Sequence, residues 1–276
     1  MEWPKLKNLI ILVLLLVNGF LLVLAGTRWE ESARYERTAL EQTAQVLKKG
    51  GIDVNLEAAV PAGGLAPTMV ERDLDRELQM AQALLGKTAQ ADNRGGGLYR
   101  YREETGELNI RAGGELSAEL ADHSCWQASH PERHAAGLLE EMGIEAEQTG
   151  LAEEDGRTRV RFRQLWNGAP VFSCEVEFVY ERGALNAVHG TLIAAGQGTE
   201  EAGQVLTLPT ALMRFSEEIA AAGDVCSDLQ SMEAGYRGTA QSLSGGVRLA
   251  PVWLVTTDTA KYYLDCVTGT LTRLAE

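Results

Sequence analysis

The stretch that decides the fold runs from residue 159 to residue 193 and reads RVRFRQLWNGAPVFSCEVEFVYERGALNAVHGTLI. Apolar residues alternate with arginines around Val160 and Phe162, and with glutamates around Val176 and Phe178. A period of two with one apolar face predicts strands that are buried on one side and wet on the other. Glu181-Arg182-Gly183 predicts a short turn, after which the chain returns as the next strand. We therefore expect antiparallel sheets.

A weak internal repeat extends this pattern along the chain. The segments of residues 47–53 (LKKGGID) and 139–145 (LEEMGIE) are alike, and a third helix is expected from about Pro209 to Ala222, before Gly223. Glycine just past a helix end tolerates the left-handed backbone that terminates helices. Each helix leads into strand-like segments, so the repeat is a helix, a glycine and a group of antiparallel strands.

These elements predict an α+β fold in which helices pack on antiparallel sheets, in two subdomains. A further helix is expected from about Thr68 to Leu85. Further strands are expected at residues 98–102, 108–111, 251–257 and 261–267, and breaks rich in Gly or Pro at Pro61–Pro67, Asp92–Gly97 and Gly196–Gly203.

Residues 6–26 (LKNLIILVLLLVNGFLLVLAG) are expected to form one membrane helix. Its 21 residues span about 31 Å at ~1.5 Å per residue, which matches a hydrocarbon core of roughly 30 Å. Trp3 and Trp29 flank it, and Lys5 and Lys7 predict a cytoplasmic N-terminus and an extracellular C-terminal part. A cleaved signal peptide is the alternative, but the apolar run exceeds the usual length of one. We expect a retained single-pass anchor in the cell membrane.

The expected organisation has four parts: a cytoplasmic tail at residues 1–5, the membrane helix at 6–26, a membrane-proximal subdomain at 27–127 and a membrane-distal subdomain at 128–276. The net charge of the chain is −14. Such a surface repels phosphate backbones, so nucleic-acid binding is not expected.

Four cysteines, at positions 125, 174, 226 and 266, would lie outside the membrane. A disulfide is chemically permitted there, and four cysteines allow three pairings. Burial of all four as small apolar side chains is the alternative. If a bridge forms, Cys226–Cys266 is the preferred pair, because both residues lie in the last folding unit.

Asn18 lies in the middle of the predicted membrane helix. An unpaired amide in hydrocarbon is costly, so Asn at this depth tends to hydrogen-bond a neighbouring helix. Either the residue is merely tolerated or it marks a contact face for a partner helix. The contact face would comprise Asn18, Leu14, Leu15, Leu21, Leu22 and Ala25.

Known catalytic motifs are absent from the sequence, which contains no G-x-S-x-G, P-loop, H-E-x-x-H or Rossmann glycine pattern. His123, Cys125, His130 and His134 gather donors that could suit zinc, although their spacing matches no known zinc module. A surface loop followed by a helix that starts at Pro131 is the simpler interpretation. We expect no catalytic residue, cofactor or metal.

Three motifs resemble the YycI family of two-component regulatory proteins. They are Glu2-Trp3-Pro4-Lys5-Leu6-Lys7 with Asn18 and Phe20, then Gln164–Phe172 (QLWNGAPVF), and Leu249–Trp253 (LAPVW) leading to Tyr262-Tyr263 and Thr268-Gly269. Residues 55–125 match least. The resemblance implies a membrane-anchored protein without enzymatic activity, whose α+β ectodomain is similar to that of the related YycH proteins.

The resemblance also implies partners: a YycH-like protein and a sensor histidine kinase of the WalK/YycG type, which controls cell-wall homeostasis in Gram-positive bacteria. The expected function is accessory regulation of this kinase through the transmembrane helix and the ectodomain. An anchored binding module for a peptide, glycan or secreted protein is the alternative. A metal-dependent hydrolase that uses the region from His123 to His134 is a third hypothesis.

Overall fold

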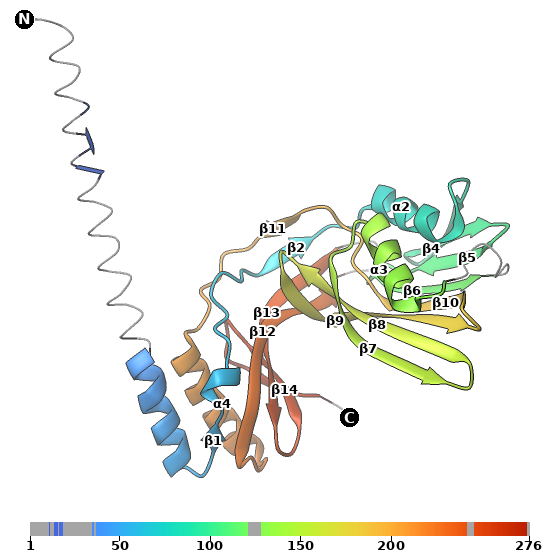
Figure 1. Ribbon diagram of the computed structural model, residues 1–276. Helices are drawn as coiled ribbons and strands as arrows, with labels where there is room; N and C mark the ends of the chain where they lie inside the picture. The colour runs from blue at the N-terminus through green and yellow to red at the C-terminus, as the bar shows by residue number, and fades with distance from the viewer. Residues whose placement is uncertain are drawn as a thin grey trace, which may run out of the picture.

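The computed structural model describes residues 11, 14, 15, 17, 18, 35, 37–120, 128–241 and 246–274. Over these ranges the fold is α+β, as expected, and its strands form one mixed sheet in which most pairs are antiparallel. Figure 1 shows two lobes. We call residues 74–191 the contiguous unit, and residues 37–70 together with residues 198–273 the composite unit.

The contiguous unit contains two copies of one pattern, a helix followed by four antiparallel strands. The first copy is α2 (Leu74–Leu85), β3 (Gln90–Gly95), β4 (Leu98–Glu103), β5 (Gly106–Ile110) and β6 (Glu115–Leu120). The second copy is α3 (Pro131–Glu141), β7 (Ala146–Glu154), β8 (Arg157–Trp166), β9 (Ala169–Glu181) and β10 (Ala184–Thr191). The last strands, β6 and β10, pair with each other, which gives the strand order β3-β4-β5-β6-β10-β9-β8-β7.

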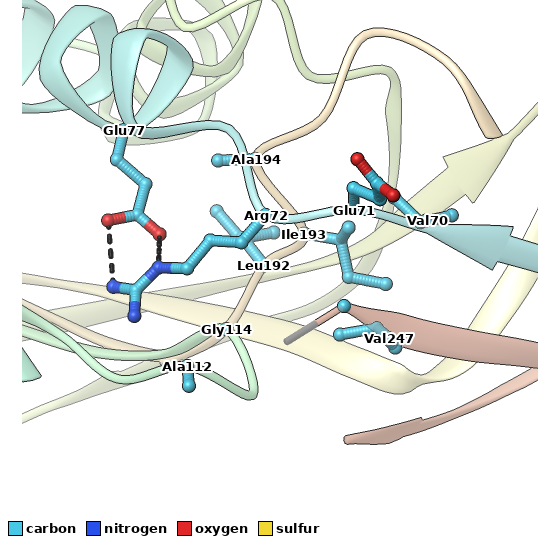
Figure 2. A pocket seen from close by; sticks show the side chains of 11 residues that line it. Val70, Glu71, Arg72, Glu77, Ala112, Gly114, Leu192, Ile193, Ala194 and Val247 are labelled. Atoms are coloured by element: carbon cyan, nitrogen blue, oxygen red, sulfur yellow. Dashed lines mark hydrogen bonds and ion pairs between the residues drawn. The ribbon is translucent and has the colours of Figure 1, made fainter. Parts of the chain in front are cut away.

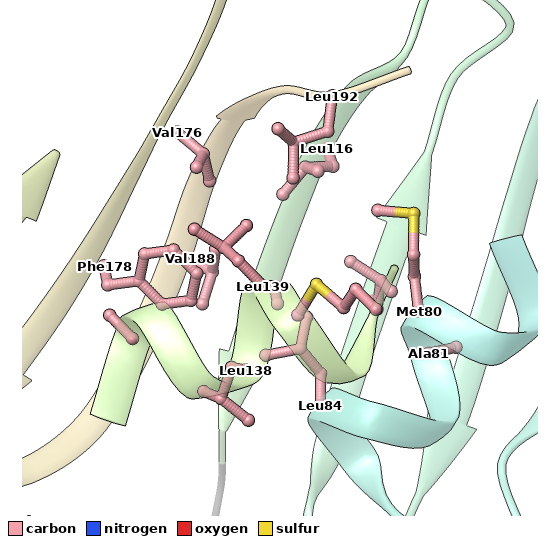
Figure 3. Close-up of a cluster of buried hydrophobic side chains, with 14 of the residues drawn as sticks. Met80, Ala81, Leu84, Leu116, Leu138, Leu139, Val176, Phe178, Val188 and Leu192 are labelled. Carbon is pink, nitrogen blue, oxygen red and sulfur yellow. The ribbon is translucent and has the colours of Figure 1, made fainter. Parts of the chain in front are cut away.

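Both helices of this unit cover the same core. Figure 3 shows Met80 and Leu84 of α2 and Leu139 of α3 above strand residues such as Phe178 and Val188. The strand side chains are buried because apolar residues occupy alternate positions and so face the helices, as the sequence predicts. The opposite face of the sheet carries the arginines and glutamates, which pair across strands, for example Arg161 with Glu177 at 3.0 Å.

The helix expected at 68–85 is shorter in the structure. The Asp73 side chain accepts hydrogen bonds from the backbone N–H groups of Asp75 and Arg76, so α2 begins only at Leu74. Thr68–Val70 instead forms β2, which pairs with β13 of the composite unit. The predicted start was therefore wrong by six residues, because β2 and the cap lie directly before the helix.

The composite unit contains a third copy of the pattern: α4 (Leu208–Ala222), β12 (Asp228–Ala240), β13 (Val247–Thr257), β14 (Lys261–Asp265) and β15 (Leu271–Arg273). The third helix is confirmed, and the chain leaves α4 through Gly223 in the left-handed conformation at φ 72°. The expected repeat is confirmed for its last two copies, whereas the first copy begins at α2 because the helix that ends at residue 49 is followed only by the two-residue strand β1. The remaining elements are a helix at residues 37–49, β1 (Asp53–Val54), a 3-10 turn η1 (Leu56–Ala58), β2 (Thr68–Val70) and β11 (Gly198–Glu200).

The subdomains expected at 27–127 and 128–276 do not coincide with these two units. The strand β6 pairs with β10, and β1 pairs with β12, so strand pairing crosses residue 128 in both units. The boundary is displaced because the N-terminal segment completes the core of the C-terminal repeat. This pairing over a long stretch of chain leaves no local signal in the sequence.

Among the described residues, no helix is both long enough and apolar enough to cross a membrane. Positions 11, 14, 15, 17 and 18 of the segment 6–26 are described, and each of them is helical. The rest of that segment lies outside the described residues, so the membrane anchor stays a prediction.

Candidate functional site

The two units meet at a junction that contains residues of the segments 164–172 and 249–253. A single parallel pair, Tyr236 with Val171, joins β12 to β9. A separate buried cluster lies around it and consists of Val70, Trp166, Val171, Cys174, Ile193, Tyr236, Val247 and Leu249. The segment 164–172 supplies Trp166 and Val171, and the segment 249–253 supplies Leu249. The two motifs, which are far apart in the sequence, therefore share one core.

Polar contacts fix the chain through this junction. The amide of Gln164, which is buried, donates from Nε2 to the Ile193 carbonyl oxygen at 3.0 Å and accepts from the Ile193 N–H at 2.8 Å. Gly235 faces the Pro170 carbonyl oxygen so closely that a Cβ atom there would clash with it. A glycine at this position lets β12 approach β9.

Arg72 clamps the connection between β2 and α2 against the contiguous unit. Its Nε donates to Glu77 Oε1 at 2.6 Å and its Nη2 to Glu77 Oε2 at 2.9 Å. Its Nη1 donates to the Gly97 carbonyl oxygen at 2.6 Å, and its guanidinium lies 4.9 Å from the centre of the Tyr99 ring. Figure 2 looks into the small cleft of about 20 Å³ beside this pair.

This ion pair is buried, with side-chain exposures of 9% for Arg72 and 4% for Glu77. Tyr101 donates its hydroxyl hydrogen to Glu77 Oε2 at 3.1 Å. Burial, together with the Glu77 charge, raises the pKa of Tyr101. Since both carboxylate oxygens of Glu77 have partners, the cluster is suited to holding the segment between β2 and α2 on the contiguous unit rather than to proton transfer.

A row of arginines and aromatic rings crosses the same junction. Phe172 and Tyr263 stack with their ring centres 6.0 Å apart. The Arg163 guanidinium lies 5.4 Å from the Phe172 ring, and the Arg237 guanidinium lies 5.4 Å from the Tyr263 ring. Glu175 lies 3.5 Å from Arg163. Phe172 and Tyr263 belong to the family motifs, but nothing in the sequence indicated that they would meet.

The helix of residues 37–49 is the element that follows the predicted membrane segment. Leu40 and Leu47 lie on one side of it, seven residues apart, as in an amphipathic helix. Leu47 is 2% exposed and belongs to the same core as Phe215 of α4 and Trp253 of β13. Figure 1 shows this helix beside α4.

The chain after this helix is also tied to the composite unit. Trp253 donates its indole N–H to the Val60 carbonyl oxygen at 2.9 Å. Lys48 Nζ lies 3.1 Å from Asp53 Oδ2, and this hydrogen-bonded cation lowers the pKa of Asp53. The helix and β1 thus belong to the composite unit instead of serving as a free linker.

The predicted transmembrane contact face is described only in part. Asn18 donates from Nδ2 to the Leu14 carbonyl oxygen at 2.9 Å, within its own helix. Leu14 and Leu15 are exposed. The other members of that face, Leu21, Leu22 and Ala25, lie outside the described residues. The partner contact stays a prediction.

The histidine region gathers no ligand set among the residues that the structure describes. His134 Nδ1 and the Tyr180 hydroxyl form a hydrogen bond of 2.8 Å, and burial lowers the pKa of His134. His130 instead lies 3.7 Å from Glu132. His123 and Cys125 lie outside the described residues.

The preferred disulfide does not form, since Cys174, Cys226 and Cys266 are free thiols. Cys226 precedes β12, at the end of the β13–β14 hairpin near Asp258, whereas the Cys266 N–H bonds to Pro251 at the other end. Six or seven residues of strand separate these ends, about 20 Å at ~3.3 Å per residue, which is too far for a bridge. Burial raises the pKa of Cys226 to about 11, which keeps it protonated.

Comparisons with known proteins give only distant likenesses. No family model and no curated protein matches the chain. One similar solved structure is an uncharacterized protein from Eubacterium rectale, with a TM-score of 0.46 and 14% identity over 82% of this chain and 86% of that chain. Another is the YpeB C-terminal domain from Bacillus megaterium, with a TM-score of 0.38 and 12% identity over 75% of this chain and 100% of that chain. The resemblance to the YycI family therefore stays a prediction.

Proposed function

We propose that this protein is a membrane-anchored accessory regulator of a sensor histidine kinase of the WalK/YycG type, acting together with a YycH-like protein and without enzymatic activity of its own. In this proposal the segment 6–26 contacts kinase helices in the membrane, and the ectodomain lies outside the cell. The motifs at residues 2–7, 164–172 and 249–253 supply the identity of the partners.

One observation of the structure supports this proposal above the others: the helix 37–49 is packed into the composite unit. Leu47 lies in one core with Phe215 and Trp253, and Val60 is hydrogen-bonded to Trp253. A ligand or partner that shifts the composite unit would therefore shift this helix, and with it the segment that precedes it. Packed interiors transmit such displacements because they are dense.

The energy required is small. A difference of 1–3 kcal/mol between the contacts made with two kinase states changes their ratio about five- to 150-fold. A few helix–helix contacts supply that much. Whether the protein activates or inhibits depends on which kinase state its helix contacts better.

The direct test replaces Asn18 with Leu in the full-length protein and measures co-purification with the kinase and expression of the genes that it controls. Asn18→Leu should reduce both. Val17→Leu, a substitution at the neighbouring position, is the matched control and should change neither. If the Asn18→Leu protein keeps the complex and the gene expression of the wild type, the proposed contact face is wrong.

An anchored binding module is the second candidate, and the row Arg163–Phe172–Tyr263–Arg237 favours it. Arg and aromatic side chains are enriched where proteins bind partners. Exchanging the segment 6–26 for an unrelated membrane helix separates the two functions. A binding module should keep its activity after the exchange, whereas a regulator that works through its own helix should lose it.

A further inference from the structure

The sheet has one free edge that is much longer than the others in the described part of the chain. The edge strand β7 has nine residues, whereas β11 and β15 have three each and β1 has two. The fifth edge, β3, has six residues but ends in glycines at positions 95–97, all with positive φ. Short edges resist pairing with other chains, and long uncovered edges invite it.

No helix or loop of the described chain pairs with the outer side of β7, whose only strand partner is β8. Most of its residues are exposed, including Leu151 at 52%. A register shift between Gln148 and Gly150 bends the strand without ending its pairing with β8. The outward backbone N–H and C=O groups are therefore available to an added strand.

The molecule itself provides a precedent at the equivalent edge of another repeat. The strand β12 occupies the same place after α4 as β7 does after α3. Its outer side is covered by extended segments of this chain: Asp53 and Val54 pair with Asp228 and Leu229, and Ala59 forms a bridge with Met232. The first strand of this repeat thus accepts an added strand in one copy, and in β7 the same position is open.

Charge decides which kind of strand fits. The segment 145–155 carries Glu145, Glu147, Glu153, Glu154 and Asp155 and no basic residue. Pairing of two copies of β7 in antiparallel fashion would bring the Glu147 end of one against the Glu153–Glu154 end of the other, and parallel pairing would align identical glutamates. Like charges opposite each other destabilise a sheet.

We infer that the β7 edge binds an extended, basic segment of another protein by strand addition. Main-chain hydrogen bonds would supply affinity, and lysines or arginines facing the glutamates would supply specificity. The inference does not depend on the kinase proposal, since it needs neither the membrane segment nor its partner.

The test uses the full chain in detergent micelles and a labelled synthetic peptide, Thr-Lys-Val-Lys-Val-Lys-Val-Lys-Thr, with a second peptide in which glutamate replaces each lysine. Fluorescence anisotropy should detect binding of the lysine peptide alone. Amide hydrogen exchange of residues 146–154 should slow when it binds, while exchange of β3 should not change. Exchange reports the backbone pairing that a purely ionic contact would not produce.

Two charge-matched variants locate the site. The double variant Glu153→Lys with Glu154→Lys should weaken binding of the lysine peptide about tenfold. The reason is that attraction between these glutamates and the peptide lysines is replaced by repulsion between like charges on adjacent strands. Glu140→Lys with Glu141→Lys, an exposed adjacent pair in α3, changes the net charge equally and should leave binding unchanged. The inference would be overturned if the lysine peptide does not bind, or binds without slowing amide exchange in β7. It would also be overturned if the glutamate peptide binds equally well, if the two variants have equal effects, or if the protein is a dimer in which β7 is already protected from exchange.

Discussion

The contiguous unit and the composite unit use the same repeat but complete their cores in different ways. In the contiguous unit two full copies join through β6 and β10, and both helices come from those copies. In the composite unit one full copy, from α4 to β15, is completed by the helix 37–49, β1 and β2. The N-terminal helix thus does what a second repeat helix does in the contiguous unit.

This difference assigns the two units different tasks. The contiguous unit buries its apolar strand positions without help from the chain ends. The composite unit depends on the segment that leads to the predicted membrane helix, since Leu47 is part of its core. Four predictions test this contrast, and each compares a site in one unit with a site in the other or with a matched control.

The largest effect is expected at the junction. Arg72→Met leaves the Glu77 carboxylate buried without its cation, which typically costs about 3–5 kcal/mol. Urea unfolding followed by circular dichroism measures the loss. The double variant Arg72→Met with Glu77→Leu should recover most of it, because no buried charge remains. A single variant as stable as the wild type would mean that the buried ion pair does not stabilise the fold.

The next effect tests the dependence of the composite unit on the N-terminal helix. Leu47→Ala removes a core side chain, and we expect a loss of about 2–3 kcal/mol. Amide exchange should accelerate in β12 and β13 more than in β8 and β9. The control is Val46→Ala, at a position that is 54% exposed, where the change should stay below about 0.5 kcal/mol. Equal acceleration in both units would contradict the contrast.

Between about pH 5 and pH 6.5, a pH effect should be confined to the contiguous unit, because the carboxylates with lowered pKa in the composite unit, Asp53 and Asp258, take up protons only at lower pH. Burial lowers the pKa of His134, so below about pH 6.5 the unfolded chain takes up a proton that the folded protein resists. The free energy of unfolding should therefore decrease as the pH falls through this window. The decrease should be smaller than the loss expected for Arg72→Met or Leu47→Ala. His134→Gln should flatten the dependence. The described composite unit contains no histidine, so its exchange rates should respond less.

The smallest effect is expected on the wet face of the contiguous unit. Arg161→Ala breaks a partly exposed pair with Glu177, and such pairs contribute less than about 1 kcal/mol. Arg157→Ala, which breaks the pair with Glu181, should behave alike. Thermal unfolding at low and high salt measures both. A loss of stability larger than about 1 kcal/mol for Arg161→Ala would indicate that the cross-strand ion pairs on this face stabilise the sheet cooperatively.

The sequence predicts the elements of this fold better than their partners. Alternation from residue 159 to residue 193 predicts β8, β9 and β10, and the helix-then-glycine pattern predicts α3 and α4, because these signals are local. The strand β7 escapes the pattern, since an exposed edge strand buries too little to show alternation. The strand β12 also escapes the pattern. Its Gly235 lies where the close approach of β9 leaves no room for a side chain, and this glycine interrupts the alternation of apolar and polar residues.

The candidate site at the junction could not be predicted from the sequence, and the contact face around Asn18 stays a prediction. Arg72 and Glu77 lie on either side of a helix start, so no regular spacing links them. Phe172 and Tyr263 come together only because β9 reaches β12 at a single pair. Contacts of this kind depend on which distant strands pair with each other. That pairing leaves no local pattern in a single sequence.

The hydrogen bond from Trp253 to Val60 spans 193 residues and sets an order of events during folding. The contiguous unit has all of its strands once residue 191 has emerged, whereas the N-terminal helix must wait for α4 and β13. Distant contacts close slowly, and chains emerge N-terminus first. The newly synthesised chain therefore passes through a stage in which its middle is folded while the helix 37–49 still holds an uncovered apolar stripe.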